Sequence, residues 1–127
     1  MGQTWLPIAS VSLLVGHTKS KRVDALIDSG AFTTYFHSDV GRAVGLKVET
    51  GEVGELHGIV AGAVAKVYYH NVRLCLAEHM VLIKAGFYDK LGCAGILGRH
   101  GFFEHFSVTF DPSNVPPGLE ITRIHRA

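Results

Sequence analysis

The chain has few of the features that mark disulfide-bonded, membrane-spanning or nucleic-acid-binding proteins. Its 127 residues include only two cysteines, Cys75 and Cys93, which are too few and too widely spaced for a disulfide framework or a zinc site. We expect both to be buried free thiols. No hydrophobic run approaches the length of about 20 residues that spans a membrane. The formal net charge is only +1, so we expect neither nucleic acid nor a membrane as a partner.

Targeting and metal-binding patterns are also missing. Residues 5–15 are interrupted by Pro7 and Ser10 and have no charged leader, so they do not predict a signal peptide. We therefore expect a cytoplasmic protein. Eight histidines are present, but none is paired at a spacing of the His-x-x-x-His kind that metal sites use. We expect no metal ion and no cofactor.

The length and composition predict one globular domain over residues 1–127. Hydrophobic residues make up 47% and charged residues 18% of the chain, a balance typical of proteins with a packed core. Short β-rich runs separated by turn residues predict an all-β fold. We find no internal repeat and no domain boundary.

One charged residue stands where packing alone does not explain it. The apolar residues Ala25, Leu26 and Ile27 lead directly into the motif Asp28-Ser29-Gly30-Ala31. Burying an ionised carboxylate is costly unless it is paired or hydrogen-bonded, and a solvated aspartate needs no apolar strand before it. The stretch therefore indicates an environment built for the acid.

The first third of the chain predicts a hairpin, a further strand and one short helix. Residues 8–15 and 23–27 are β-rich and flank the basic run Lys19-Ser20-Lys21-Arg22, which we interpret as a solvated turn in preference to a phosphate-binding patch. Residues 32–36 are aromatic and β-branched, which favours a strand. Ser38 can cap a helix that ends at Gly45.

The middle of the chain predicts a glycine-containing hairpin with an uncharged tip. Residues 64–69 favour a strand, and the tip consists of Ile59, Val60, Ala61 and Gly62. Solvated turns usually carry polar residues beside glycine. The apolar tip therefore either packs on its own core or covers something else.

The last third predicts five more strands and one more short helix. His70-Asn71 predicts a turn, followed by strands over 72–76 and 81–83. Gly95-Ile96-Leu97-Gly98 predicts a buried strand whose glycines allow another backbone to approach closely. The spacing of three phenylalanines predicts a helix over 99–106. Residues 106–111 predict a strand, and residues 119–124 an edge or interface strand that follows a proline-containing loop.

Over residues 23–111 the chain resembles the retropepsin-like aspartic proteases. The resemblance rests on Asp28-Ser29-Gly30-Ala31 after an apolar strand, on the glycine-containing hairpin, and on Gly95-Ile96-Leu97-Gly98-Arg99 about seventy residues later. It implies an all-β, small closed barrel with a flap hairpin and one or two short helices. Residues 112–127 would then form a C-terminal loop and a possible interface strand.

The resemblance also implies a two-chain catalytic centre. Peptide hydrolysis of this kind uses two carboxylates that share one proton, whereas this chain has a single Asp-Ser-Gly. The second carboxylate would come from the Asp28 of another copy in a two-fold homodimer. Residues 5–8 and residues 119–124 would supply intersubunit strands.

The remaining motif residues receive roles only from the resemblance. Ser29 would brace the two acid loops across the dimer, Gly30 would expose its carbonyl to a peptide, and Ala31 would keep the floor of the site small. The tip residues 59–62 would form a flap over the substrate, while Ile96, Leu97 and Gly98 support the acid loop. Arg99 resembles an arginine that pairs with an acid just after the motif. Phe32 occupies that acid's place here, which leaves Glu104 or a C-terminal group as candidate partners of Arg99.

Two functions remain open at this point. The first is a homodimeric aspartic endopeptidase that acts on peptides or proteins and favours apolar side chains, in pockets that include Phe32. The second is a catalytically weak module of the same fold that serves in dimerisation or peptide binding. The intact acid motif favours the endopeptidase, and Phe32 favours the module.

Overall fold

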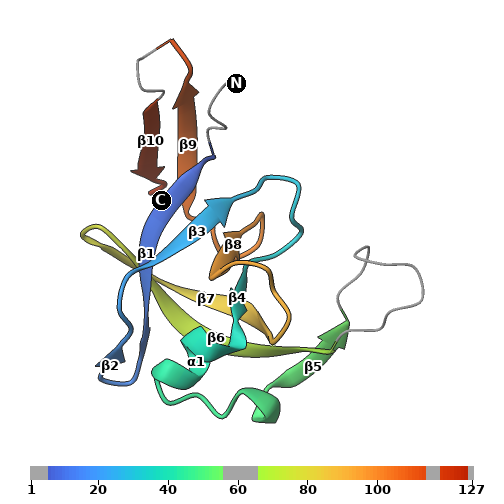
Figure 1. The fold of residues 1–127 in the computed structure, drawn as a ribbon. Helices are drawn as coiled ribbons and strands as arrows, with labels where there is room; N and C mark the ends of the chain where they lie inside the picture. Colours follow the sequence, from blue (N-terminus) through green and yellow to red (C-terminus); the bar gives the residue numbers. More distant parts are fainter. Residues whose placement is uncertain (1–5, 56–65, 114–117, 126–127) are drawn as a thin grey trace.

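Six strands close into a barrel in the computed structural model, which describes residues 6–55, 66–113 and 118–125 (Figure 1). In order around the barrel the strands are β1 (Ile8–Val15), β3 (Val23–Ile27), β8 (Gly95–Leu97), β4 (Tyr35–His37), β7 (His79–Tyr88) and β6 (Lys66–Leu76), which pairs again with β1. The short strand β2 (Thr18–Lys19) pairs with β1 outside this ring, and β5 (Glu52–Glu55) pairs with β6. The predicted all-β closed barrel is confirmed.

Side chains that point into the barrel form its hydrophobic core. Along β1 the buried residues Ala9, Val11 and Leu13 alternate with more exposed neighbours at one end, as expected for a strand with one face on the core. Phe36 and Phe87 come from neighbouring strands and their ring centroids lie 6.3 Å apart in the core. The predicted hairpin between residues 8–15 and 23–27 is confirmed, because β1 and β3 pair antiparallel.

The strand β8 lies between β3 and β4. It runs parallel to β3, with Leu26 opposite Ile96 and Ile27 opposite Leu97, and antiparallel to β4. A Cβ atom at Gly95 would lie 2.7 Å from the ring of Phe36, so a glycine is required for these strands to pack. Because β3 ends beside β8, the residues that follow both strands are brought together.

One short α-helix, α1 (Ser38–Ala43), and one 3₁₀ turn, η1 (Val48–Thr50), cover one end of the barrel. The predicted helix is confirmed, but its predicted cap was wrong: His37 is the N-cap, and its Nδ1 accepts a hydrogen bond from the Asp39 N–H. Ser38 is instead buried in the first turn, where its hydroxyl bonds to the carboxylate of Asp89.

The predicted turn at His70-Asn71 was wrong. The strand β6 passes through both residues and forms nine consecutive cross-strand pairs with β7. His70 is held in the strand because its Nε2 lies 2.8 Å from the Val48 carbonyl oxygen and its ring packs edge-on against Phe87. These tertiary contacts override the local preference of His-Asn for a turn.

Two further boundaries differ from the sequence expectations. The strand expected over 32–36 is shifted: β4 begins at Tyr35, and Phe32 lies in an exposed loop. The segment 99–106 forms successive turns instead of a helix. Gly101 has a φ of +93°, which a right-handed helix does not accommodate.

A separate two-stranded sheet lies outside the barrel. It consists of β9 (Phe106–Asp111) and β10 (Gly118–Arg123), paired antiparallel, and it projects beyond the barrel next to the N-terminal end of β1 (Figure 1). Both strands were expected from the sequence.

No helix within the described ranges has the length and apolarity needed to cross a membrane.

Candidate active site

Asp28 lies at the end of β3 in a loop that hydrogen bonds hold in place. Its N–H donates to the Leu97 carbonyl oxygen at 2.9 Å, and its own carbonyl oxygen accepts from the Ala31 N–H at 3.1 Å. Its Oδ1 accepts from the Gly30 N–H at 2.9 Å. The side chain is only half-buried, so the carboxylate is oriented by the loop and still reachable.

The segment after β8 is clamped against this acid loop. The N–H of Arg99 donates to the Ala31 carbonyl oxygen at 2.9 Å, and the N–H of His100 donates to the Phe32 carbonyl oxygen at 3.0 Å. A Cβ atom at Gly98 would lie 2.0 Å from the Thr33 carbonyl oxygen. The two backbones approach so closely that only glycine fits at Gly98.

Thr34 connects the two segments through its side chain, and sequence reasoning missed this role. Its hydroxyl donates to the His100 carbonyl oxygen at 2.7 Å and accepts from the Gly98 N–H at 3.1 Å. The residue is fully buried, and its hydroxyl satisfies one backbone acceptor and one backbone donor of the segment after β8. The available signal was a polar residue within an aromatic run that was expected to form a strand.

The structure brings most of the predicted site residues together. Leu97 is fully buried beneath the acid loop, and Ile96 lies on the same strand between β3 and β4. Ser29 is exposed, and within the described ranges its hydroxyl forms no hydrogen bond. The predicted flap tip Ile59, Val60, Ala61 and Gly62 lies outside the described residues, between the paired strands β5 and β6.

Arg99 contacts an aromatic ring where the resemblance implies an acid. Its Cζ lies 5.7 Å from the centroid of the Phe32 ring, and the same ring meets His100 edge-on at 4.6 Å. Glu104, one candidate partner of Arg99, accepts from the Gly101 N–H at 2.8 Å. Among the residues that the structure describes, no carboxylate lies within ion-pair distance of the Arg99 guanidinium.

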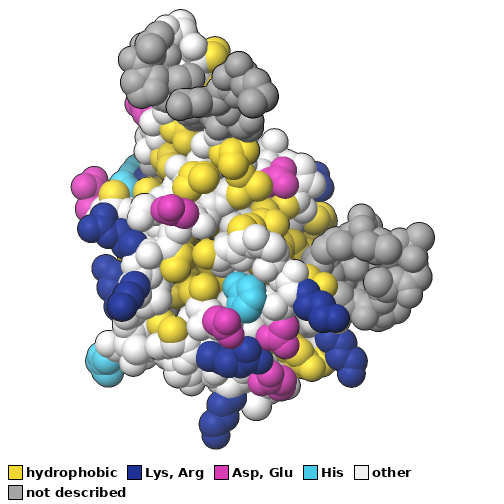
Figure 2. Space-filling model, in the orientation of Figure 1, with side chains coloured by type: hydrophobic (Ala, Val, Ile, Leu, Met, Phe, Trp, Pro, Cys, Tyr) yellow, Lys and Arg dark blue, Asp and Glu magenta, His cyan; other side chains and the backbone are white. Residues whose placement is uncertain are grey.

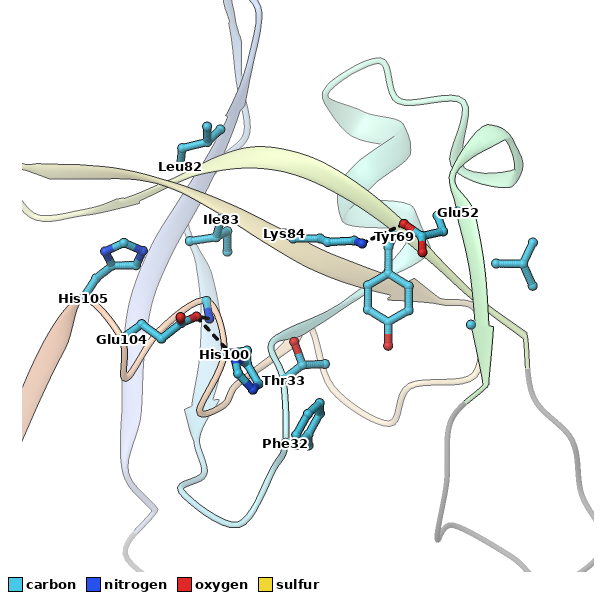
Figure 3. A pocket seen from close by; sticks show the side chains of 13 residues that line it. Phe32, Thr33, Glu52, Tyr69, Leu82, Ile83, Lys84, His100, Glu104 and His105 are labelled. Carbon is cyan, nitrogen blue, oxygen red and sulfur yellow. Dashed lines mark hydrogen bonds and ion pairs between the residues drawn. The ribbon is translucent and has the colours of Figure 1, made fainter.

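A groove of about 560 Å³ opens between the acid loop and the sheet (Figure 3). Tyr69 reaches from β6 toward the side on which Thr33 and Phe32 lie (Figure 3), and the Lys84 Nζ lies 2.7 Å from Glu52 Oε2 along the sheet. The lining residues are Phe32, Thr33, Glu52, Val53, Gly54, Tyr69, Leu82, Ile83, Lys84, His100, Gly101, Glu104 and His105. Phe32 and Thr33, which follow the acid loop in the sequence, form one wall of this groove.

Two ionisable groups are held in one form: Tyr35, which neighbours the groove residue Tyr69, and Glu104 in the groove itself. Burial, followed by the neighbouring Tyr69, raises the pKa of Tyr35 far above its usual range, so this phenol stays neutral. The hydrogen bond from the Gly101 N–H lowers the pKa of Glu104, with smaller contributions from the adjacent histidines. The groove therefore carries a fixed negative charge at Glu104 near neutral pH.

No cluster of three His, Cys, Asp or Glu side chains suited to a metal ion occurs in the described part of the chain.

A second, apolar groove of about 410 Å³ adjoins Ser29. It lies between the end of β3 and the β9–β10 sheet, and its lining residues are Pro7, Ile27, Ser29, Phe103, Val108, Phe110 and Leu119. Leu6, Ile8 and Phe110 are 54%, 44% and 50% exposed. Figure 2 shows hydrophobic side chains on this face between the projecting sheet and the barrel.

Among known proteins, the chain resembles solved structures in its fold, but it matches no family by its sequence. No protein-family model and no curated protein matches the chain. The retroviral protease-like domain of Ddi1 from Leishmania major aligns with a TM-score of 0.62 and 17% identity, over 94% of this chain and 92% of that one. A retropepsin-like aspartic protease from Rickettsia conorii aligns with a TM-score of 0.62 and 13% identity, over 90% and 86%.

A viral enzyme gives a similar result. The EIAV protease, in complex with the inhibitor HBY-793, aligns with a TM-score of 0.54 and 17% identity, over 78% of this chain and 86% of that chain. These neighbours share only 13–17% of their residues with the chain but align over most of its length. The chain therefore has the retropepsin-like fold.

Proposed function

We propose that the chain is an aspartic endopeptidase whose catalytic centre forms when two copies bring their Asp28 carboxylates together. The observation that carries this proposal is the fixed and reachable position of Asp28, at the end of β3 in a loop clamped by the segment after β8. Such a loop suits a group that acts on a ligand, because it fixes the direction of the carboxylate without burying it.

One chain offers a single carboxylate in this setting. Among the other described aspartates, Asp39 and Asp89 pair with Arg42, and Asp111 accepts hydrogen bonds from Ser113. Asp24 is exposed on β3. A second Asp28 from another copy is therefore the simplest source of the second carboxylate.

The apolar groove beside Ser29 supports a homodimer. The groove includes Ser29 of the acid loop and the exposed side chain of Phe110, so a second copy that covered the groove would also bring the two acid loops toward one another. Apolar surface of this kind is typical of protein interfaces. In this dimer the Ser29 hydroxyl would find its partner across the interface.

The chemistry follows from two carboxylates at close range. Two like charges cannot both ionise readily, so the pair holds one proton, an established property of carboxylate dyads. The ionised carboxylate takes a proton from water as the water oxygen bonds to the carbonyl carbon, and the protonated carboxyl donates its proton to the carbonyl oxygen. The C–N bond then breaks as the carboxyl that took the water proton gives it to the amine nitrogen, and the hydroxyl proton returns to the other carboxylate, which restores the pair with its one proton. Because one member must be ionised and the other protonated, activity passes through a maximum between the two apparent pKa values of the pair.

The substrate would lie extended along the groove of about 560 Å³. Main-chain hydrogen bonds from the sheet and the acid loop would hold it in the manner of an added strand. Phe32, Val53 and Leu82 line the groove and are exposed, which favours apolar substrate side chains. A peptide-library profile checks this preference, and charged residues on both sides of the cut would contradict it.

A non-catalytic peptide-binding module remains the second candidate. The observation that favours it is Phe32, because Arg99 rests on an aromatic ring in place of an acid. Both candidates predict a dimer and a peptide in the groove, and only the endopeptidase needs the Asp28 carboxylate.

Cleavage of a mixed protein substrate at acidic and near-neutral pH separates the two candidates. We expect Asp28→Ala to lower the rate by about 10²–10⁴-fold, the usual contribution of a general acid or base. Asp24→Ala is the matched control, because Asp24 is an exposed aspartate on β3, the strand that leads into Asp28, and its substitution should leave the rate unchanged. Equal rates for wild type and Asp28→Ala, with a dimer present in both, would leave only the binding module.

A further inference from the structure

A polar pocket of about 400 Å³ lies at the opposite end of β3 from Asp28. Strands β1 and β2, the connection from β2 to β3, and the end of β6 with its turn all contribute to it. Its lining residues are Ser10, Ser12, Lys19, Ser20, Arg22, Cys75 and Ala77. The pocket shares no residue with the two grooves beside the acid loop, so a ligand here would not occupy the proposed catalytic centre.

All the charge that lines this pocket is positive. Lys19 and Arg22 supply two cations, three serines supply hydroxyl groups, and none of the lining residues is a carboxylate. Figure 2 shows Lys and Arg side chains gathered along the edge of the molecule on the side of β2. Cations combined with hydroxyl donors form the strong, charge-assisted hydrogen bonds that bind oxyanions.

Ser12, on β1, lines the pocket but does not belong to the solvated basic turn. It is only 3% exposed and lies opposite Cys75 across the β1–β6 pair, yet its hydroxyl forms no hydrogen bond with any described residue. No fully buried side-chain nitrogen or oxygen in the described part of the chain lacks a hydrogen-bond partner, so the unpaired Ser12 hydroxyl keeps some contact with solvent. Because Ser12 lines the pocket, this hydroxyl is available to a ligand there.

The basic run is also held in position over the pocket. The Ser20 hydroxyl accepts from the Leu13 N–H at 2.9 Å and donates to the Lys21 carbonyl oxygen at 2.8 Å. This pair of bonds fixes the chain between Lys19 and Arg22 against β1. Lys21 belongs to the same run but does not line the pocket, so only part of the run faces a ligand.

We propose that this pocket binds a phosphate group, with the Ser10 and Ser12 hydroxyls donating to its oxygens and Lys19 and Arg22 balancing its charge. The phosphate can belong to a phosphorylated residue or be free in solution, since the pocket recognises the chemistry that both share. Asp24 lies opposite Ser10 in the β1–β3 pair, so its carboxylate is on the same face and weakens binding by repulsion.

Titration of the ¹⁵N-labelled chain tests this proposal directly. Inorganic phosphate and O-phosphoserine are added in separate arms at constant ionic strength. We expect saturable shifts of the Ser12, Ser20 and Ala77 amide signals, and no equivalent shifts with chloride. Tighter binding of O-phosphoserine would identify a phosphorylated residue as the better ligand, and tighter binding of inorganic phosphate would favour the free ion.

The variants separate a built site from general basic charge. Arg22→Gln and Ser12→Ala should each weaken phosphate binding by about fivefold or more, because each removes a direct donor. Lys21→Gln should change it by less than about twofold, because a solvated lysine contributes only screened attraction. Asp24→Asn should strengthen binding, which makes the proposal testable even if Ser12→Ala folds poorly.

Several results would overturn the proposal. Shifts that do not saturate, or an equal loss of affinity in Lys21→Gln and Arg22→Gln, would show that phosphate only screens surface charge. Unchanged binding in Asp24→Asn would place the ion elsewhere. Asp28→Ala should bind phosphate like the wild type, so the outcome does not depend on the proposed peptidase activity.

Discussion

At the scale of single residues, Arg99 contacts the side chain at position 32, as the resemblance implies, but the contact is with the aromatic ring of Phe32 and not with an acid. An aspartate or glutamate at position 32 could form an ion pair with Arg99. The ring instead offers its face to the guanidinium at 5.7 Å and its edge contact to His100. A cation–π contact at an exposed site contributes about 0.5–1 kcal/mol, in the same range as an exposed ion pair.

A double-mutant cycle of Phe32→Leu and Arg99→Gln measures this contact. We expect a coupling free energy of about 0.5–1 kcal/mol from urea unfolding, because leucine keeps the apolar volume but loses the ring. Additive effects of the two substitutions would mean that Arg99 is held by some other group.

Gly98 is the residue whose backbone contact most limits substitution. A Cβ atom there would lie 2.0 Å from the Thr33 carbonyl oxygen and 2.8 Å from that of Ala31. Both obstacles are backbone, so no side chain can move aside. We expect Gly98→Ala to destabilise the chain by about 3 kcal/mol or more.

Gly92→Ala is the control for Gly98→Ala. A Cβ atom at Gly92 meets nothing within 4 Å, so its free energy of unfolding should change by less than about 0.5 kcal/mol. Thermal or denaturant unfolding of the two variants checks both values. Similar stabilities would contradict the close approach of the two segments.

At the scale of elements, the sequence predicted strands with regular alternation better than segments set by tertiary contacts. Strands β1, β3 and β9 follow from their own residues. The strand at His70 does not, because its bond to the Val48 carbonyl oxygen joins positions far apart in the sequence. The segment 99–106 reads as a helix by the spacing of its phenylalanines, but Gly101 at a φ of +93° prevents one.

The candidate site, like the strands, was predictable from the sequence only where a local motif marks it. The acid loop and the strand beneath it carry local motifs, and the structure places them together. The roles of Thr34 and Tyr69 were missed, because the bonds of Thr34 to His100 and Gly98 and the place of Tyr69 in the groove depend on segments far apart in the sequence.

Arg42 ties three elements together and predicts how stability responds to acid. On α1 it lies 2.6 Å from Glu49 at η1 and 3.2 Å from Asp89 after β7. The hydrogen bond from Arg42 lowers the pKa of Glu49, and the Ser38 hydroxyl, followed by Arg42, lowers that of Asp89. Both carboxylates are therefore more acidic in the folded chain than in the unfolded one.

The sign of the pH effect follows from these lowered pKa values. Stabilisation by Arg42 is present above the ordinary carboxylate pKa of about 4 and is lost as the pH falls through the lower folded-state values. We expect Arg42→Gln to be less stable than wild type near neutral pH, with the difference vanishing in strong acid and shrinking in high salt because the groups are exposed. A difference in urea midpoint that persists at low pH would show that Arg42 acts through packing.

At the scale of the whole molecule, the barrel presents the acid loop next to an apolar face and the projecting β9–β10 sheet. The core is complete within one chain, since the ring of six strands closes on itself. The proposed chemistry is not complete, because one chain carries one Asp28 in an acid loop. The proposed activity therefore depends on the association of two copies.

Subunit mixing measures that dependence most directly. Wild-type chain is equilibrated with a ninefold excess of Asp28→Asn, and cleavage of a peptide substrate is compared with that of the same amount of wild-type chain alone. If each site needs two Asp28 carboxylates and the copies exchange freely, activity falls to about one tenth, because nearly every wild-type chain is paired with a variant. Undiminished activity, with exchange confirmed by mass measurement of mixed dimers, would show that one Asp28 suffices and would contradict the two-chain centre.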